Sequence, residues 1–352
     1  MTARQLWPHD ELAPAEVAGG PTVLITSRLG GWAAQWDRLV DRSPLPSPFL
    51  RSWWLAVASG PASRFLLVAR DDQLLGGLAV QSDRRLGLHS LRMLGSGTLC
   101  PDHLDLLAAS GHEETVASLL RSTLSRVRVG LVDLQGVRAE PMLTAALPWR
   151  VRKQVHDVAP WARLPRDLAD YPALLRRNVR RASGKLTSQG AEHRAHRGAA
   201  VTGALATLRV LHQAQWGADS RFLPGFGRFA AACELGAAAG EVVVHELHVA
   251  DTVIASLVAF EVAGRVSLYQ SARLTDPRWR DATTVLLHTI IADARERGLS
   301  EVDFLRGNEG YKAGFAPERR ELVRLQGAVS FPAKAATAAE MAARGVQRAT
   351  RR

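Results

Sequence analysis

The chain has 352 residues, of which 47% are hydrophobic and 22% charged, and its formal net charge is +11 at pH 7. This balance excludes a disordered or fibrous protein, and the length is sufficient for two domains with substantial cores. No stretch approaches the roughly 20 apolar residues of a membrane-spanning helix, and the first residues lack the apolar run of a signal peptide. We therefore expect a cytoplasmic protein.

The cysteines and the net charge say little about which ligands the protein binds. Cys100 and Cys233 lie far apart in the sequence and belong to no ligand motif, which argues against disulfides and structural zinc. The excess positive charge favours anionic ligands without identifying one.

An internal repeat organises the chain. Residues 66–80 predict two strands joined by a turn at 71–73, and residues 245–259 repeat this plan with the turn at 250–252. In both segments a turn aspartate is followed by apolar residues, two small residues and further apolar residues. The repeat therefore favours a tandem duplication.

A second pair of segments repeats at a similar interval. A strand at 131–136 corresponds to one at 301–307, and each follows a segment with the apolar spacing of an amphipathic helix. Prolines interrupt the sequence between 148 and 172, which marks the boundary between the halves. We predict mixed α/β (α+β) halves at 1–150 and 165–330, followed by an alanine- and arginine-rich tail at 331–352.

A basic helix is predicted at 174–186, "LLRRNVRRASGKL". Its apolar residues occupy one face, and arginines and a lysine cover the rest. The basic face is either merely solvated or a clamp on an anionic group. The apolar face is predicted to contain Leu174, Leu175, Val179, Ala182 and Leu186. Farther along, His212 and Trp216 share a helix face; we expect Trp216 to pack in the core and His212 to line a pocket.

The strand at 301–305 runs directly into a polar loop that ends in Tyr311 and Lys312. The loop is either a solvated turn or a functional segment, because loops at strand ends often carry function. Asp303 lies within the strand and is either paired or catalytic, and its counterpart Asp133 in the first half favours a structural role.

Several known motifs are absent from the sequence. The segment His-Glu-Leu-His at 245–248 lacks the i, i+4 spacing of zinc-binding helices and lies in a predicted strand, so we expect no metal. There is no phosphate-binding P-loop, no dinucleotide glycine fingerprint and no nucleophile elbow.

Four segments of the second half resemble a known family. They are the basic helix, "LHQAQWG" at 211–217, the long hairpin ending near Asp276-Pro277, and "VDFLRGNEGYKAGF" at 302–315. Together they resemble the GNAT superfamily of acyltransferases, within it the CelD-like (cellulose-biosynthesis-type) acetyltransferases, relatives of the FemAB transferases. The resemblance implies tandem GNAT-like (acyl-CoA N-acyltransferase) domains, with mixed sheets flanked by helices and a degenerate first half.

The resemblance implies direct transfer of an acyl group from acetyl-CoA or another acyl-CoA to an amine or hydroxyl. Tyr311 is a candidate acid because a phenol keeps its proton at neutral pH, Glu309 is a candidate base, and Asp303 is a third catalytic candidate. Where the group usually shows Ser-Pro-Gly at the start of the long helix, this chain has Ala282, Thr283 and Thr284. Threonine obstructs the close backbone approach that glycine allows.

The remaining candidates divide between coenzyme and acceptor. Phosphate binding at the start of a helix would use backbone N–H groups, hydroxyls and guanidinium groups. The coenzyme candidates are Arg278, Arg280, Thr283 and Thr284. The acceptor candidates are Arg177, Arg181, His212, Arg306 and Lys312. We expect Arg177 and Arg181 to bind an anionic acceptor at a distance from the coenzyme phosphates.

Two rival functions remain open. One is a FemAB-like transferase that uses aminoacyl-tRNA, whose phosphates the basic helix would bind; otherwise we expect no nucleic-acid partner. The other is a non-catalytic binding protein that has lost the coenzyme site, as the residues at 282–284 would allow. The resemblance alone suggests a small-molecule acceptor such as a sugar or cell-envelope precursor.

Overall fold

The computed structural model describes residues 7, 20–85, 87–97 and 99–330. The predicted tail at 331–352 lies outside the described residues. No helix in the described part of the chain combines the length and the apolar character needed to cross a membrane.

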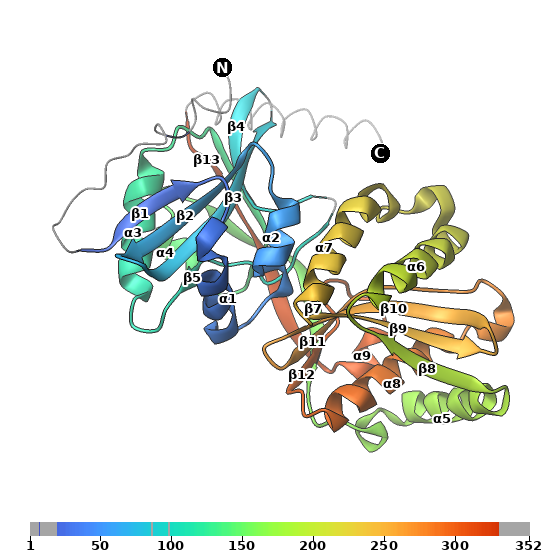
Figure 1. The fold of residues 1–352 in the computed structure, drawn as a ribbon. Helices are drawn as coiled ribbons and strands as arrows, with labels where there is room; N and C mark the ends of the chain where they lie inside the picture. Colours follow the sequence, from blue (N-terminus) through green and yellow to red (C-terminus); the bar gives the residue numbers. More distant parts are fainter. Residues whose placement is uncertain (1–6, 8–19, 86, 98, 331–352) are drawn as a thin grey trace, which may run out of the picture.

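Apart from α5 (Ala173–Ser188) and β5 (Leu107–Ala108), the same succession of elements occurs twice along the chain (Figure 1). The first half contains β1 (Thr22–Thr26), α1 (Ala33–Arg42), α2 (Ser52–Ala58), β2 (Ser63–Arg70), β3 (Gln73–Arg85), β4 (Leu88–Met93), β5 (Leu107–Ala108), α3 (Glu113–Ser125), β6 (Leu131–Arg138), α4 (Leu143–Ala146) and β7 (Arg152–Arg163). The second half contains α5 (Ala173–Ser188), β8 (Ala191–His196), α6 (Ala200–Trp216), α7 (Phe226–Ala238), β9 (Val242–Val249), β10 (Thr252–Val262), β11 (Arg265–Arg273), α8 (Ala282–Glu296), β12 (Glu301–Asp303), α9 (Lys312–Phe315) and β13 (Glu318–Ala328).

The two predicted hairpins are confirmed, together with their turns. β2 pairs with β3 and β9 pairs with β10, both antiparallel. Asp71 in the first turn and Ala250 in the second both have a φ of 50°, a left-handed conformation that few non-glycine residues adopt. Two turns with the same unusual backbone, in equivalent places, are what a duplicated unit would give.

Within the described residues one sheet of thirteen strands runs through both halves, in the order β1-β2-β3-β4-β6-β13-β7-β12-β11-β10-β9-β8, with β5 beside β3. The last strand of each half crosses to the other half. β13 pairs with β6 of the first half, and β7 pairs with β12 of the second. We call β7 and β13 the exchanged strands; they also pair with each other and lie at the centre of Figure 1.

The sequence analysis placed a domain boundary where the structure has a strand. β7 begins and ends between the two predicted halves, although Pro160 lies within it. Proline lacks an N–H group, but its carbonyl accepts a hydrogen bond from Phe304 at 2.8 Å. The prolines therefore frame a strand that joins the halves instead of a linker that separates them.

Both faces of the second-half sheet are covered, as the continuous apolar sequence of β10 requires. Val258 and Phe260 face α6 and α7 in a core that continues into the first half. Leu257 and Ala259 face α5 and α8 in a second core. The two-residue alternation of the strand thus divides its side chains between two hydrophobic layers.

Aromatic side chains join the halves on the α6–α7 side. The Trp53 ring lies 5.8 Å from that of Phe260, and the Trp54 ring lies 6.0 Å from that of Tyr269. The Trp53 indole N–H also donates to Glu241 at 2.7 Å. This contact buries large apolar surfaces, so the two halves form one packed unit.

We predict that the isolated segment 165–330 does not unfold cooperatively. Without the first half, β13 has neither of its neighbours and β12 has lost β7. Exposed strand edges and the uncovered aromatic face should leave a loosely packed chain. Near-ultraviolet circular dichroism during heating tests this, with co-expression of 1–164 as the restoring control. A sharp transition of the isolated segment would contradict the prediction.

Candidate functional site

The polar loop after β12 leaves the neighbouring strand β11 and follows β7. β11 and β12 are parallel and pair only from Arg265–Glu301 to Ser267–Asp303. Beyond that point Gly307 donates its N–H to Val158 of β7 at 3.0 Å. No described segment forms a backbone ladder with β11 on this side after Ser267. We call this unpaired stretch of the strand edge the gap.

The first half has the equivalent gap, but its own chain fills it. β4 and β6 are parallel and pair only at Ser90–Leu131 and Leu91–Val132. Farther along, Leu104 donates its N–H to Gly136 at 2.9 Å and accepts the Arg138 N–H at 3.1 Å. The segment around Leu104 therefore pairs with β6 beyond β4, whereas no described segment pairs with β11 at the equivalent place in the second half.

Asp303 is fully buried at the end of β12. One carboxylate oxygen lies 2.9 Å from His103 Nε2 and 3.0 Å from Arg265, and the other accepts the Leu305 N–H at 2.7 Å. Burial alone would raise the pKa of Asp303, but His103, Arg265 and the Leu305 N–H outweigh it and hold the pKa well below its ordinary value. This placement favours a structural role over catalysis.

Arg306 and Lys312, both acceptor candidates, have partners within the protein. Arg306 donates from its Nε to the buried Asp102 at 2.6 Å and from its Nη2 to the Pro101 carbonyl at 2.7 Å. Lys312 is buried, and its ammonium donates to the Arg306 carbonyl at 2.8 Å and lies 2.8 Å from Glu309. Both cations fix the loop instead of projecting toward a ligand.

Tyr311 is an exposed side chain of the loop. Half of its surface is accessible, and Glu309 beside it is more than half exposed. Desolvation of the hydroxyl, followed by the repulsion of Glu309, raises the pKa of Tyr311 to about 12. The phenol is therefore protonated throughout the physiological range.

The beginning of α8 has free backbone donors. The Val285 N–H bonds to the Asp281 carbonyl, whereas the N–H groups of Ala282, Thr283 and Thr284 have no partner among the described residues. A helix N-terminus with unpaired amides attracts anions through these donors and through the helix dipole.

Basic side chains from two helices gather at this end of α8. Arg278 and Arg280 come from the preceding turn and are exposed. Arg181 Nη2 of α5 lies 3.9 Å from Asp281, and Lys185 of α5 donates to the Arg278 carbonyl at 3.1 Å. The basic helix and the predicted coenzyme residues therefore form one positive surface, whereas the sequence analysis placed them apart.

Lys185 was missed as a candidate, although it follows Arg181 by one helical turn and so shares its face. In the first half, the corresponding helix α3 instead carries Glu113 and Glu114 in its first turn. Carboxylates at a helix N-terminus stabilise the helix but repel phosphate. The two halves thus differ in charge at equivalent helix ends.

The basic helix is confirmed, with one correction. Val179, Ala182 and Leu186 are buried as expected, but Leu174 lies in its first turn and is 62% exposed. Arg177 is exposed.

Trp216 does not pack in the core as expected, and His212 is the buried residue of this pair. His212 is buried, with its ring 5.0 Å from that of Phe222 and its Nδ1 3.3 Å from the Ser220 hydroxyl. Burial lowers the pKa of His212, so its imidazole is neutral at pH 7. Trp216, in contrast, is 50% exposed.

α5 connects the polar loop with the start of α8. A side chain added at Gly314, just after the loop, would meet Leu175 at 2.7 Å, so α9 lies directly against this part of α5. Lys185, at the other end, contacts Arg278. The two contact points are about 15 Å apart along the helix. The polar loop and the start of α8 therefore lie against opposite ends of α5.

Residues 173–313 match the model of the acetyltransferase (GNAT) domain. The match covers α5 through the polar loop, the region that contains the gap, the start of α8 and Tyr311. It identifies an acetyltransferase (GNAT) domain in the second half, and the chain is thus an enzyme of the acyltransferase type. No curated protein sequence matches the chain.

Solved structures of the same fold include FemX, with a TM-score of 0.59 at 10% identity over 82% of this chain and 95% of FemX. L-PGS from Bacillus licheniformis gives a TM-score of 0.54 at 10% identity, and the match covers 80% of this chain and 88% of L-PGS. The C-terminal domain of a putative lysylphosphatidylglycerol synthetase from Agrobacterium fabrum gives a TM-score of 0.56 at 12% identity. This match covers 88% of this chain and 95% of that domain. These likenesses establish the fold alone and confirm the predicted mixed sheet flanked by helices.

We predict that Asp303→Asn lowers the free energy of unfolding by about 3 kcal/mol at pH 7. The substitution removes a buried charge that four groups share, namely His103, Arg265, Arg320 and the Leu305 N–H. The folded-state pKa of Asp303 lies below its unfolded value, so its stabilisation is present above about pH 4 and is lost as the pH falls toward the folded pKa. The difference in the free energy of unfolding between wild type and variant should therefore become smaller as the pH falls from 7 to 3.

Urea unfolding at both pH values tests this prediction. Asp83→Asn is the control, since Asp83 pairs with Arg92 at 3.2 Å and is 54% exposed, and it should cost less than about 0.5 kcal/mol. A constant difference across the pH range would show that the charge of Asp303 is unimportant.

Proposed function

We propose that the second half transfers an acyl group from an acyl-CoA, with acetyl-CoA as the first candidate, directly to an amine or hydroxyl. The observation that carries the proposal is the start of α8, where unpaired amides meet Arg181, Lys185, Arg278 and Arg280. Such a site suits the pyrophosphate of coenzyme A. Thr283 and Thr284 are half-buried there and add hydroxyl donors.

The gap beside β11 supports this proposal. An extended pantetheine arm carries amide groups, which would bond the strand edge that β11 leaves unpaired beyond Ser267. The first half lacks both features, because the segment around Leu104 fills its gap and Glu113 opens its helix with a carboxylate. We therefore assign the activity to the second half and regard the first as degenerate.

Tyr311 is our candidate for the acid. The acceptor attacks the thioester carbonyl, the carbon–sulfur bond breaks, and the departing thiolate takes a proton. A phenol with a pKa of about 12 carries that proton at neutral pH, and the exposure of Tyr311 leaves it accessible. Glu309 is our candidate to receive the proton of the acceptor, directly or through water, because its carboxylate is exposed beside Tyr311.

The observed packing of α5 changes which residues we assign to the acceptor. Arg181 lies at the start of α8 and belongs, in this proposal, to the coenzyme side, which leaves Arg177 for the acceptor. His212 is buried, and Arg306 and Lys312 are engaged within the protein, so none of the three contacts the acceptor directly. The assignment of a sugar or cell-envelope precursor as the acceptor rests on the resemblance to the CelD-like group.

Thermal unfolding with acetyl-CoA, longer acyl-CoAs and free coenzyme A tests the proposed function. A ligand at 100 times its Kd stabilises the folded state by about 2.7 kcal/mol. We expect acetyl-CoA, longer acyl-CoAs and free coenzyme A all to raise the midpoint of thermal unfolding, since each contains the pyrophosphate. No shift with any of them would remove the basis of the proposal.

The alternative donor is aminoacyl-tRNA, as in FemAB-type transferases. The fold of FemX and the exposed basic face of α5, with Arg177, Arg180 and Arg181, favour this alternative. A tRNA donor would bind with strong salt dependence, and the coenzyme would not raise the unfolding midpoint. Gel-shift titration at two salt concentrations separates the two donors.

We predict that Tyr311→Phe lowers kcat for acyl transfer by 10²–10⁴-fold, or roughly 3–5 kcal/mol, because the thiolate loses its acid. The coenzyme KM should stay within about twofold, since the ring remains in place. Steady-state kinetics under conditions where chemistry limits turnover measures both constants. An unchanged kcat would remove Tyr311 from the reaction.

We also predict that replacing Arg181 and Arg280 together with alanine raises the coenzyme KM by at least about tenfold, since each charge-assisted bond contributes roughly 1.5–3 kcal/mol. The matched control is Arg194→Ala, an exposed arginine of β8 that pairs with Glu192 at 3.2 Å and should leave the KM unchanged. If the double variant raises only the acceptor KM, the earlier assignment of Arg181 to the acceptor is correct.

A further inference from the structure

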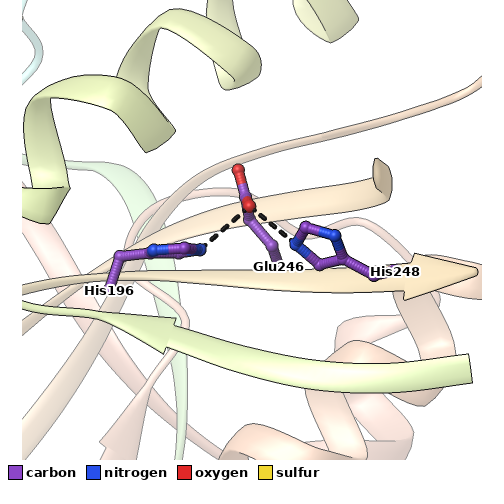
Figure 2. Close-up of side chains that lie close together, drawn as sticks. All are labelled: His196, Glu246 and His248. Carbon is purple, nitrogen blue, oxygen red and sulfur yellow. Dashed lines mark hydrogen bonds and ion pairs between the residues drawn. The ribbon is translucent and has the colours of Figure 1, made fainter. Parts of the chain in front are cut away.

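Three metal-binding side chains meet at the edge of the second-half sheet. His196 comes from the edge strand β8, and Glu246 and His248 come from its neighbour β9 (Figure 2). In the antiparallel register His196 lies opposite Val244, so all three point to the face that α6 covers. Their ligand atoms lie within 4.8 Å of one another.

Figure 2 shows the Glu246 carboxylate between the two imidazoles. One oxygen, Oε2, lies 2.9 Å from His196 Nε2 and 2.9 Å from His248 Nε2. The other, Oε1, is buried and has no hydrogen-bond partner among the described residues. The Ser256 hydroxyl, on the strand directly opposite Glu246, is also buried without a partner.

Among the described residues no arginine or lysine forms an ion pair with Glu246. The carboxylate is 4% exposed, and the arginine opposite it in register, Arg194, lies 3.2 Å from Glu192. Among the described residues its only polar contacts are the two imidazoles. A buried carboxylate with one unpaired oxygen is costly unless a cation accompanies it.

We propose that His196, Glu246 and His248 bind a divalent transition-metal ion, with Zn²⁺ as the best match. Two imidazoles and one carboxylate are a common zinc ligand set and leave one position open. Ligand atoms around tetrahedral zinc are about 3.3 Å apart. Each nitrogen would move away from Oε2 by a few tenths of an ångström, and the two nitrogens, which lie within 4.8 Å of each other, would approach by up to about 1.5 Å. His196 is 25% exposed, which gives an ion a route from solvent.

The proposed site ties the outermost strand to the sheet. Among the described strands β8 has a neighbour on one side only, and an unsupported edge strand is prone to opening. A shared ion holds His196 of β8 to two residues of β9. This inference does not depend on the acyltransferase proposal, since the site lies on strands remote from the polar loop in the sheet order.

Isothermal titration of the untagged, chelator-treated full chain with ZnCl₂ tests the proposal. We expect one ion per chain, with binding weakened on the order of 100-fold or more in His196→Ala and in Glu246→Gln. The zinc-dependent rise in the unfolding midpoint should disappear in the same variants. Co²⁺ should give the visible absorption of a four- or five-coordinate site.

Two histidine variants serve as controls. His156→Ala removes an exposed histidine of β7 and should leave binding unchanged. His193→Ala removes a histidine of β8 that faces the opposite side and lies 3.0 Å from His245. Absence of stoichiometric binding would overturn the proposal, and so would binding that survives His196→Ala but is lost in His193→Ala. His196→Ala alters a partly exposed edge residue, so circular dichroism is expected to show an intact fold.

Discussion

The exchange of β7 and β13 fixes the arrangement of the whole molecule. β13 belongs to the second half by sequence, yet its arginines reach a buried aspartate in each half: Arg324 binds Asp133 at 2.6 Å, and Arg320 lies 3.4 Å from Asp303. Backbone pairing and ion pairs therefore act on the same strand. Because each half completes the other, the polar loop after β12 is held against the first half through Arg306 and Asp102.

The two halves share an arrangement of elements but differ in charge and in strand pairing. Both place a parallel strand pair, a gap and a helix N-terminus in the same relation. In the first half the chain around Leu104 fills the gap and Glu113 makes the helix end negative. In the second half the gap is unpaired and Arg181 makes the helix end positive. The fold is shared, whereas the charge at the helix end and the pairing beside the parallel strands are not.

Local patterns in the sequence predicted local structure well. The repeated turns at Asp71 and Ala250, the hairpins and the basic helix follow from periodicity over a few residues. The sequence did not reveal the strand exchange, the position of α5 beside α8, or His196 beside Glu246, since each depends on segments far apart in the chain. Helical spacing placed His212 and Trp216 on one face, but only the packing of Phe222 decides which is buried.

Hydrogen–deuterium exchange with and without coenzyme A tests the central claim most directly, because it reports on the amides that would bind the ligand. The account predicts slower exchange in two segments: 281–285, where α8 begins with unpaired amides, and 268–273, where β11 has one free edge. The equivalent helix start at Glu113 should not change. Coenzyme binding that leaves 281–285 unprotected, or that protects the first half instead, would contradict the account.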